Sequence, residues 1–281
     1  MTVTQAMITS TQRVRRGQVA LAVTRFDPPG GGHRPQPARV VFVHGLAGHA
    51  GEWLPLASRG AGGWALDQRG HGESTRHPPT VSPEAYADDL AAVIEAVARS
   101  RPVCLVGHAM GALTALLVAT RRPELVESLL LLEASPNSLD RAGVEQLRAA
   151  LTGWPVPFPT HDHAVGFFGD TPSGRARADG LVRTPEGWHP AFALNVILDT
   201  ARQLARRDWW PDWATLSCPI TVLAAEHGTL RPGELHAMAT MPTRGPRPTI
   251  RVVPHAGHHL HLDAPDTVRH TLHTLTIPLN R

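Results

Sequence analysis

Two stretches of the chain hold residues whose types and spacing could do chemistry. The first, LVGHAMGALTALLVA (105–119), sets a short apolar run before a Gly-x-x-x-Gly turn and a helix of small residues. Gly107 and Gly111 permit a tight turn, and the free N–H groups at a helix start favour negative charge. Between them stands Ala109, whose methyl group cannot attack a substrate. The turn therefore predicts a site for negative charge that lacks a nucleophile at position 109.

The second stretch, PHAGHHLHLDAP (254–265), is rich in histidine. It contains His255, His258, His259 and His261, and imidazole is the side chain that exchanges protons near neutral pH. A metal site would need ligands on one face. We interpret this spacing as giving no helical i, i+4 face of ligands and no acidic partner at strand spacing. We therefore expect no metal site here.

Both stretches belong to a chain that alternates apolar strands with helices. RVVFVHG (39–45) is a continuous apolar run, typical of a strand buried on both faces, and Ser82 followed by Pro83 marks a helix start. This alternation predicts a mostly parallel sheet with helices on both faces. We expect strands at 18–26, 39–45, 63–70, 103–107, 128–134, 219–225 and 249–258, and helices at 82–98, 110–120 and near 265–276.

Two segments depart from this alternation. Residues 1–16 are polar, and we expect them to be frayed. Residues 137–212 lack a strong buried strand and hold most of the aromatic residues. They predict a helical cap over the C-terminal edge of the sheet, where such sheets place their sites. The expected organisation is a core of residues 1–136 and 213–281 with the cap inserted between them.

The composition excludes some classes of function. The 281 residues are 42% hydrophobic and 18% charged, with a formal charge of +3. These values suit a globular protein with one large domain, or with a core and a small lid. The basic residues are arginines in scattered short runs, unlike the footprint of a nucleic-acid binder. Cys104 and Cys218 form no CxxC pair, and no stretch is long enough to span a bilayer. We expect a cytoplasmic protein that needs no cofactor and binds neither nucleic acid nor membrane; the oligomeric state stays open.

Four stretches in order, over about residues 18 to 276, resemble the α/β-hydrolase superfamily. They are HGLAG (44–48), LDQRGHGES (66–74), LVGHAMGA (105–112) and PHAGHHLHLDAP (254–265). The resemblance implies an α/β-hydrolase fold, that is, a mostly parallel, doubly wound sheet with a helical cap insertion. It also implies that residues 107–111 form the strained strand-to-helix elbow that presents the family's nucleophile. Here that position is Ala109.

The same resemblance assigns roles around the elbow. His258 matches the family's base, and the backbone N–H groups of Leu46 and Met110 match its oxyanion hole. Two such donors contribute a few kcal/mol to a developing oxyanion. Because both donors belong to the backbone, this part of the machinery does not need a serine at position 109.

The acid that would orient His258 departs from the family pattern. Gly228 stands where the family usually places an aspartate. Glu133, at the end of the apolar run LLLLE, follows another strand from which some members supply the acid, and Glu226 is the alternative. Glu133 could instead be a salt-bridged strand-end residue. Asp67 matches a structural position that we expect to pair with neighbouring backbone and Arg69.

The substrate pocket is expected to combine motif histidines with aromatic residues of the cap. Some of the cap aromatics would face the substrate and the rest would form core. The candidates are His44, His108, His259, Trp154, Phe158, Phe167, Phe168, Trp188 and Phe192.

Three functions fit these residues. The one we favour is serine-free acid–base chemistry, such as epimerisation of an amino-acid centre in a peptide natural product, with an enolate held by the oxyanion hole. It resembles the serine-lacking members represented by the bottromycin epimerase, because nucleophile and acid positions depart together. The alternative is an ester, lactone or amide hydrolase whose nucleophile at Ala109 has been replaced. The third is a non-catalytic binder of a small molecule or peptide.

Overall fold

The computed structural model describes residues 8–27, 39–99, 101–137 and 139–276. A single eight-stranded sheet forms its centre, in the order β1-β2-β4-β3-β5-β6-β9-β10. The pairs from β4 to β10 are parallel, and β1 and β2 are antiparallel. The sheet strands are β1 Ile8–Arg16, β2 Val19–Phe26, β3 Val40–Val43, β4 Gly63–Leu66, β5 Val103–His108, β6 Val126–Leu132, β9 Ile220–His227 and β10 Thr249–Gly257.

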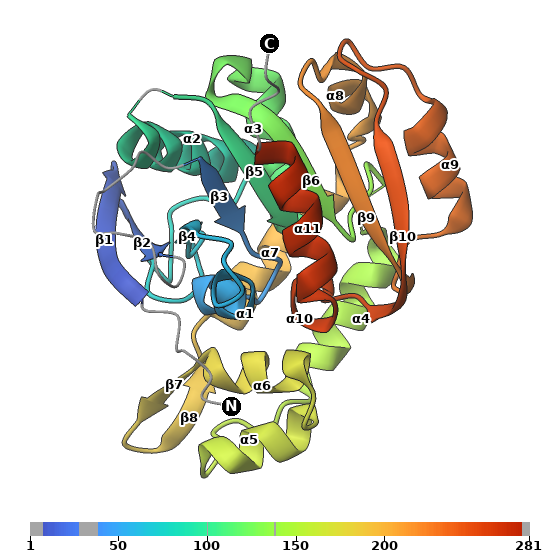
Figure 1. Cartoon of the computed structure of the whole chain (residues 1–281). Helices are drawn as coiled ribbons and strands as arrows, with labels where there is room; N and C mark the ends of the chain where they lie inside the picture. The colour runs from blue at the N-terminus through green and yellow to red at the C-terminus, as the bar shows by residue number, and fades with distance from the viewer. Residues whose placement is uncertain (1–7, 28–38, 100, 138, 277–281) are drawn as a thin grey trace.

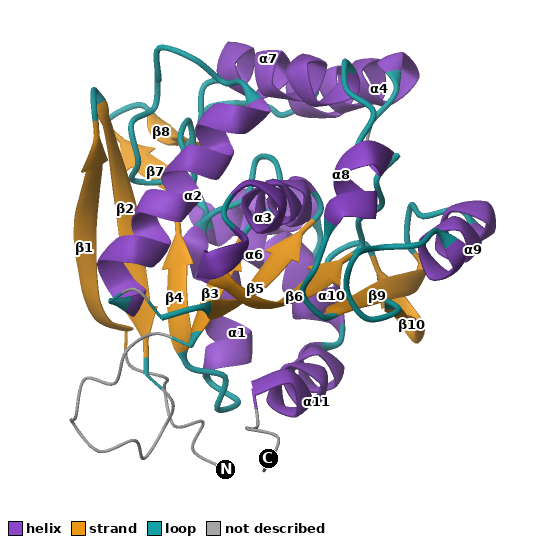
Figure 2. Cartoon of the chain, turned by 90° about the horizontal axis from the view of Figure 1, so that it is seen from above, coloured by secondary structure: helices purple, strands orange, loops and turns teal. Residues whose placement is uncertain are grey.

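Helices cover both faces of this sheet (Figure 2). One apolar core joins the sheet to α2, α3 and α8, and a second joins it to α1, α10 and α11. The helices are α1 Leu54–Ala57, α2 Pro83–Ala98, α3 Met110–Arg121, α4 Arg141–Thr152, α5 His161–Phe168, α6 Pro172–Asp179, α7 Leu194–Ala205, α8 Trp210–Thr215, α9 Pro232–Thr240, α10 Leu260–Asp263 and α11 Pro265–Thr276, with 3-10 turns η1 Ala50–Trp53 and η2 Pro123–Leu125. The expected α/β-hydrolase fold and doubly wound sheet are confirmed.

The expectation of a frayed segment before residue 17 is wrong for the part that the structure describes. β1 pairs antiparallel with β2, from Ser10 opposite Arg25 to Arg16 opposite Val19. The strand lies at the sheet edge, where one face and one side meet water, so its polar and charged residues are compatible with a strand. Residues 1–7 lie outside the described part of the chain.

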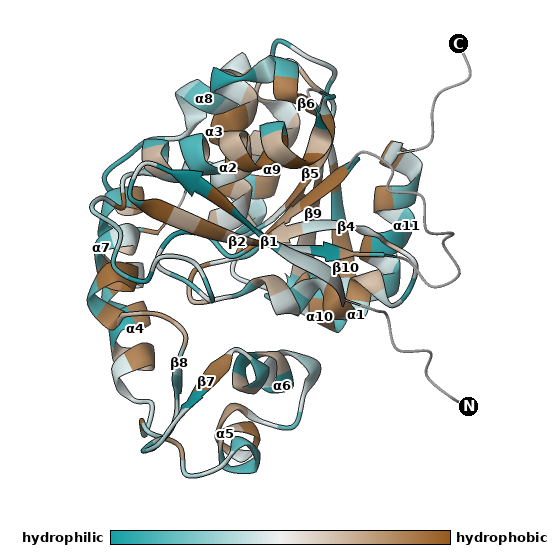
Figure 3. Cartoon of the chain, turned by 90° about the vertical axis from the view of Figure 1, so that its left-hand side faces the viewer, coloured by the Kyte–Doolittle hydropathy of each residue, from teal (hydrophilic) through white to brown (hydrophobic). Residues whose placement is uncertain are grey.

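The segment between β6 and β9 contains the helices α4 to α8 and the hairpin of β7 (Leu181–Thr184) and β8 (Gly187–Pro190). Figures 1 and 3 show α5, α6 and the hairpin grouped together beside one end of the sheet layer. They enclose a small apolar core of their own around Phe158, Ala164 and Leu181. The boundaries at 137 and 212 remain a prediction. Trp209 and Trp213 are buried in the main core.

Among the described residues, every helix is too short or too polar to cross a bilayer.

Candidate active site

The elbow between β5 and α3 has the backbone that its sequence requires. Ala109 caps α3 with φ +47° and ψ −115°, a conformation that costs an L residue on the order of 1–3 kcal/mol. Its glycine neighbours cannot carry a side chain. A Cβ on Gly107 would lie 2.5 Å from Ala112 Cα, and one on Gly111 would collide with the Val43 carbonyl. The surrounding packing therefore fixes the elbow, whichever residue stands at position 109.

The predicted oxyanion donors come from two segments that meet beside the elbow. Met110 is the first residue of α3, so its N–H has no acceptor within the helix. Leu46 lies in the turn closed by the Gly48 N–H, which donates to the Gly45 carbonyl at 3.2 Å. A Cβ on Gly45 would come within 3.5 Å of Ala109 Cβ, which places this turn against the elbow.

Two buried histidines hold the turn in place. The Gln68 N–H donates to His44 Nε2 at 3.0 Å, so the Nδ1 of that ring carries the proton and donates to the Gly45 carbonyl. The Ala47 N–H donates to His71 Nε2 at 3.1 Å, and His71 Nδ1 donates to the Arg69 carbonyl. Burial lowers the pKa of His44 to about 4 and that of His71 to about 3. Both rings are therefore neutral at pH 7.

The structure brings His258 and Glu133 together. His258 Nδ1 lies 4.0 Å from Glu133 Oε1, and the carboxylate is fully buried. Four donors hold that carboxylate: the backbone N–H groups of Ala225, Thr229 and Leu230, and the Thr229 hydroxyl. Burial disfavours the ionised form of Glu133, but the His258 ring and the N–H donors outweigh it and lower the pKa of the carboxyl. Glu133 is therefore an oriented anion beside His258.

Gly228 and Glu226 fit this arrangement. A Cβ on Gly228 would collide with the Glu133 carboxylate, so the glycine at the family's usual acid position leaves room for an acid from β6. The alternative acid, Glu226, is half-exposed and accepts from the His255 N–H at 2.7 Å. It thus interacts with another histidine of the loop.

Several residues predicted to line the pocket have other surroundings. His44 and His108 are buried, and burial together with the neighbouring His258 lowers the pKa of His108 well below its ordinary value. Phe158 is buried in the core of the cap, against Phe167 and Phe168. These side chains are therefore buried and are not open to a ligand from solvent.

The remaining cap aromatics differ in exposure. Phe167 is 48% exposed and lines a cavity on the cap surface with Pro155, Pro157 and neighbouring residues. Trp154 and Trp188 are half-buried and pack beside the cap core.

Contacts of Phe192, Trp154 and His259 connect the segment 137–212 to the core. Phe192 forms an isolated bridge with His71 beneath the oxyanion turn, and its ring lies 5.7 Å from that of Trp154. His259 is half-buried, and the charge of Arg177 on α6 contributes to a pKa lowered to about 3, after burial and His258. The junction of cap and core therefore lies next to the elbow.

Asp67 has the expected structural role and pairs with neighbouring backbone, but the predicted pairing with Arg69 is wrong. Its carboxylate accepts from the Ala50 and Glu73 N–H groups at 2.7 and 2.9 Å. Arg69 instead forms a buried two-bond pair with Asp89, both contacts at 2.7 Å. A bidentate carboxylate on α2 matches the guanidinium fork.

Sequence reasoning missed Glu52 and the role of His71. Glu52 on η1 lies within 4.8 Å of ring nitrogens of His108 and His261, measured between potential metal-ligating atoms. Nothing in the sequence pairs a residue near position 52 with one near 261. His71 lies in the LDQRGHGES motif, which could have drawn attention to it.

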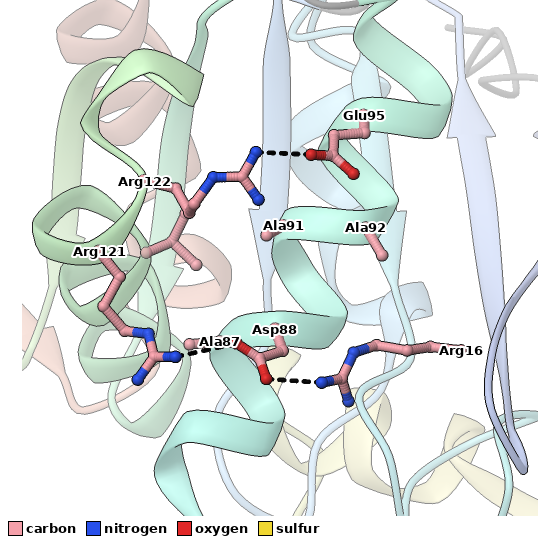
Figure 4. A pocket seen from close by; sticks show the side chains of 9 residues that line it. Arg16, Ala87, Asp88, Ala91, Ala92, Glu95, Arg121 and Arg122 are labelled. Carbon is pink, nitrogen blue, oxygen red and sulfur yellow. Dashed lines mark hydrogen bonds and ion pairs between the residues drawn. The ribbon is translucent and has the colours of Figure 1, made fainter.

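A separate cavity lies between the edge strand β1 and helices α2 and α3 (Figure 4). Its charged groups are already paired: Arg16 and Arg121 with Asp88, and Arg122 with Glu95. It is on the outer surface of the helix layer and contains no group of the elbow.

Known proteins are similar to this chain in sequence and in fold. Residues 40–271 match the model of the alpha/beta hydrolase family. The chain is 28% identical over 239 residues to 2-(acetamidomethylene)succinate hydrolase of Mesorhizobium japonicum, covering 81% of this chain and 84% of that protein. It is also 28% identical to an esterase of Mycobacterium tuberculosis, over 90% of this chain and 85% of that protein.

The solved structures agree in fold. The crystal structure of E-2-(acetamidomethylene)succinate hydrolase superimposes with a TM-score of 0.82, at 24% identity, over 95% of this chain and 98% of that one. With the family match extending from β3 into α11, the chain belongs to the alpha/beta hydrolase family.

Proposed function

We propose that this protein is a hydrolase of small carbonyl compounds, such as esters or amides, in which His258 activates water directly. The observation that carries the proposal is the Glu133–His258 pair beside an intact elbow. The hydrolase and esterase relatives support this reading over epimerisation.

The mechanism follows from the groups around the elbow. Glu133 lies beside Nδ1 of His258 and stabilises the ring when it is protonated. Nε2 then accepts a proton from water, and the resulting hydroxide attacks the substrate carbonyl carbon. The Leu46 and Met110 N–H groups hold the oxyanion. Collapse of this intermediate breaks the bond to the leaving group, which takes the proton back from His258. Ala109 takes no part, so no acyl-enzyme forms.

The substrate would enter where the cap meets the core. His49 Nε2 on the core donates to the Ala176 carbonyl of α6 at 2.9 Å, and Phe192 lies beside Trp154. This apolar and aromatic surface suits a small, partly apolar acyl group or leaving group.

Epimerisation is the second candidate, and the alanine at position 109 is the observation that favours it. The same oxyanion donors would stabilise an enolate, and His258 would remove the α-proton. Return of a proton from water to the opposite face of the enolate would complete the inversion. This route needs no nucleophile at the elbow.

Two measurements separate these candidates. The first is hydrolysis of a panel of p-nitrophenyl esters by the native chain, by Ala109→Ser and by His258→Ala. Hydrolase function predicts slow turnover by the native chain that His258→Ala abolishes. Ala109→Ser should turn over faster, by up to about 10⁶-fold, and should be labelled by a fluorophosphonate. Absence of turnover by the native chain, or turnover that persists in His258→Ala, would overturn the proposal.

The second measurement is deuterium uptake at the substrate Cα in heavy water, with peptide substrates and the native chain. Uptake that needs His258 would establish epimerisation. If peptides take up no deuterium while esters are hydrolysed, epimerisation is refuted.

A further inference from the structure

We propose that Glu52, His108 and His261 form a buried site for a divalent transition-metal ion of the zinc class, next to Ala109. The inference is independent of the proposed hydrolase function, because it rests on ligand geometry alone. It differs from the expectation from sequence that the histidine-rich stretch forms no metal site.

The three side chains present ligand atoms that converge in the interior. Glu52 is 4% exposed, His108 2% and His261 0%. One ligand atom from each lies within 4.8 Å of the other two. A tetrahedral zinc ion with Zn–N distances near 2.0–2.1 Å needs ligand atoms about 3.3 Å apart. His261 Nε2 and Glu52 Oε2 are 3.4 Å apart, which is already this spacing. His108 offers a ring nitrogen within 4.8 Å of both partners.

The hydrogen bonding of His108 leaves a free lone pair in this site. His108 Nε2 lies 2.9 Å from the His258 carbonyl oxygen. Since a carbonyl only accepts, Nε2 carries the proton and Nδ1 carries the lone pair. That Nδ1 is buried with no hydrogen-bond partner among the described residues. Metal-bound histidines characteristically donate their second ring N–H to a backbone carbonyl in this way.

His261 also has a buried ring nitrogen without a hydrogen-bond partner. Its Nδ1 is buried without a hydrogen-bond partner in the described chain, and its Nε2 faces Glu52 Oε2 at 3.4 Å. The ring is stacked on Trp53 with centroids 4.4 Å apart. Buried polar atoms are normally satisfied. Two buried imidazoles, each with an unpartnered ring nitrogen, beside one buried carboxylate therefore suit a shared ligand.

Two glycines of the oxyanion turn leave space for these ligand atoms. A Cβ on Gly45 would lie 2.8 Å from His108 Nδ1, and one on Gly48 would lie 2.9 Å from Glu52 Oε2. The unpaired nitrogen and the carboxylate thus face the same short turn. An ion bound between them would tie that turn, and with it the Leu46 N–H, to η1 and α10.

The donor set indicates the class of ion. Two imidazoles and one carboxylate are suitable ligands for Zn²⁺, and three protein ligands leave a fourth position for water or substrate. Harder cations such as Ca²⁺ and Mg²⁺ prefer oxygen ligands throughout.

A second cluster on the surface supplies the control. Glu226, His227 and His255 also bring ligand atoms within 4.8 Å of one another, but all three are exposed. Zinc bound only there would be adventitious. A Glu226→Gln, His255→Gln double variant removes two of the three surface ligands and leaves the buried site intact.

The test is equilibrium dialysis of the chelator-treated full-length chain against Zn²⁺ over hours, since burial makes entry slow. The surface double variant should retain one tight equivalent of zinc. Adding Glu52→Gln or His261→Gln to it should weaken that binding more than about 100-fold, because loss of second-shell partners alone costs 10–100-fold. X-ray absorption of the zinc-loaded surface variant should show two imidazoles and oxygen ligands.

Binding that disappears in the surface double variant would overturn the proposal, and so would a native chain that takes up no zinc. The absorption measurement covers the case in which Glu52→Gln fails to fold, because it uses only the well-packed parent. Fewer than two imidazoles on the ion would likewise refute the site.

Discussion

Replacing Glu133 with alanine tests how the acid of the site is held. The change removes the acceptor of three backbone N–H groups, on Ala225, Thr229 and Leu230, at 2.7, 2.5 and 3.2 Å. An unsatisfied buried donor costs about 1–3 kcal/mol. The Ala225 bond is buried and the other two are partly buried, so we expect a loss of about 3 kcal/mol in the free energy of unfolding.

Urea unfolding measures this loss. With a denaturant slope of about 3 kcal/mol/M for a chain of this size, the midpoint should fall by about 1 M. Glu133→Gln retains one carbonyl acceptor and should lose roughly half as much. Glu226→Ala is the matched control, because its half-exposed carboxylate accepts from only one backbone N–H, that of His255. Its midpoint should shift by less than about 0.3 M.

The catalytic role is measured separately, in the Ala109→Ser background. There Glu133→Gln should lower ester turnover by about 10⁴-fold, as loss of the acid does in serine triads, whereas Glu226→Gln should leave it unchanged. Equal losses of stability in Glu133→Ala and Glu226→Ala would refute the hydrogen-bond reasoning. Unchanged turnover in Glu133→Gln would refute Glu133 as the partner of His258.

Three further outcomes follow from the same structure. Gly111→Ala should destabilise the chain by more than about 3 kcal/mol by forcing a methyl group into the β3 backbone, whereas Gly166→Ala, in open space on α5, should stabilise it by about 0.5–1 kcal/mol in urea unfolding. Asp89→Asn should cost about 3–5 kcal/mol, measured the same way, because it leaves the buried Arg69 guanidinium uncompensated. The pKa of His44 in the folded chain is lowered to about 4. Its contribution to the free energy of unfolding is therefore complete above the unfolded pKa near 6.5 and is lost as pH falls toward 4. Between pH 7.5 and 4.5, the stability of His44→Gln should decline less than that of the native chain.

The sequence predicts the central strands because their burial leaves a clear pattern. Val40–Val43 and Val103–His108 are continuous apolar runs, and both are buried on each face. β1 could not be predicted from a buried apolar run, because an edge strand tolerates polar residues on its open side. Trp209 falls within the predicted cap, 137–212, yet it packs in the main core together with Trp213. Aromatic content alone does not distinguish the interior of one layer from that of another.

The site divides in the same way between local and long-range information. The elbow at 107–111 and His258 lie in contiguous motifs, so the sequence indicates them directly. Glu133 could be proposed because a carboxylate that ends an apolar strand needs a partner. Glu52 could not be paired with His261, because about two hundred residues separate them and only the packing of η1 against α10 brings them together.

The geometry of the elbow makes Ala109→Ser a direct test of the missing nucleophile. Its positive φ is imposed by the contacts that Gly107 and Gly111 make with α3 and β3, and the side chain at 109 plays no part in them. A serine would inherit the same backbone and the same Met110 donor, with one hydroxyl added. A change in turnover by Ala109→Ser would therefore report the nucleophile alone, whereas an altered elbow would appear first as a change in stability.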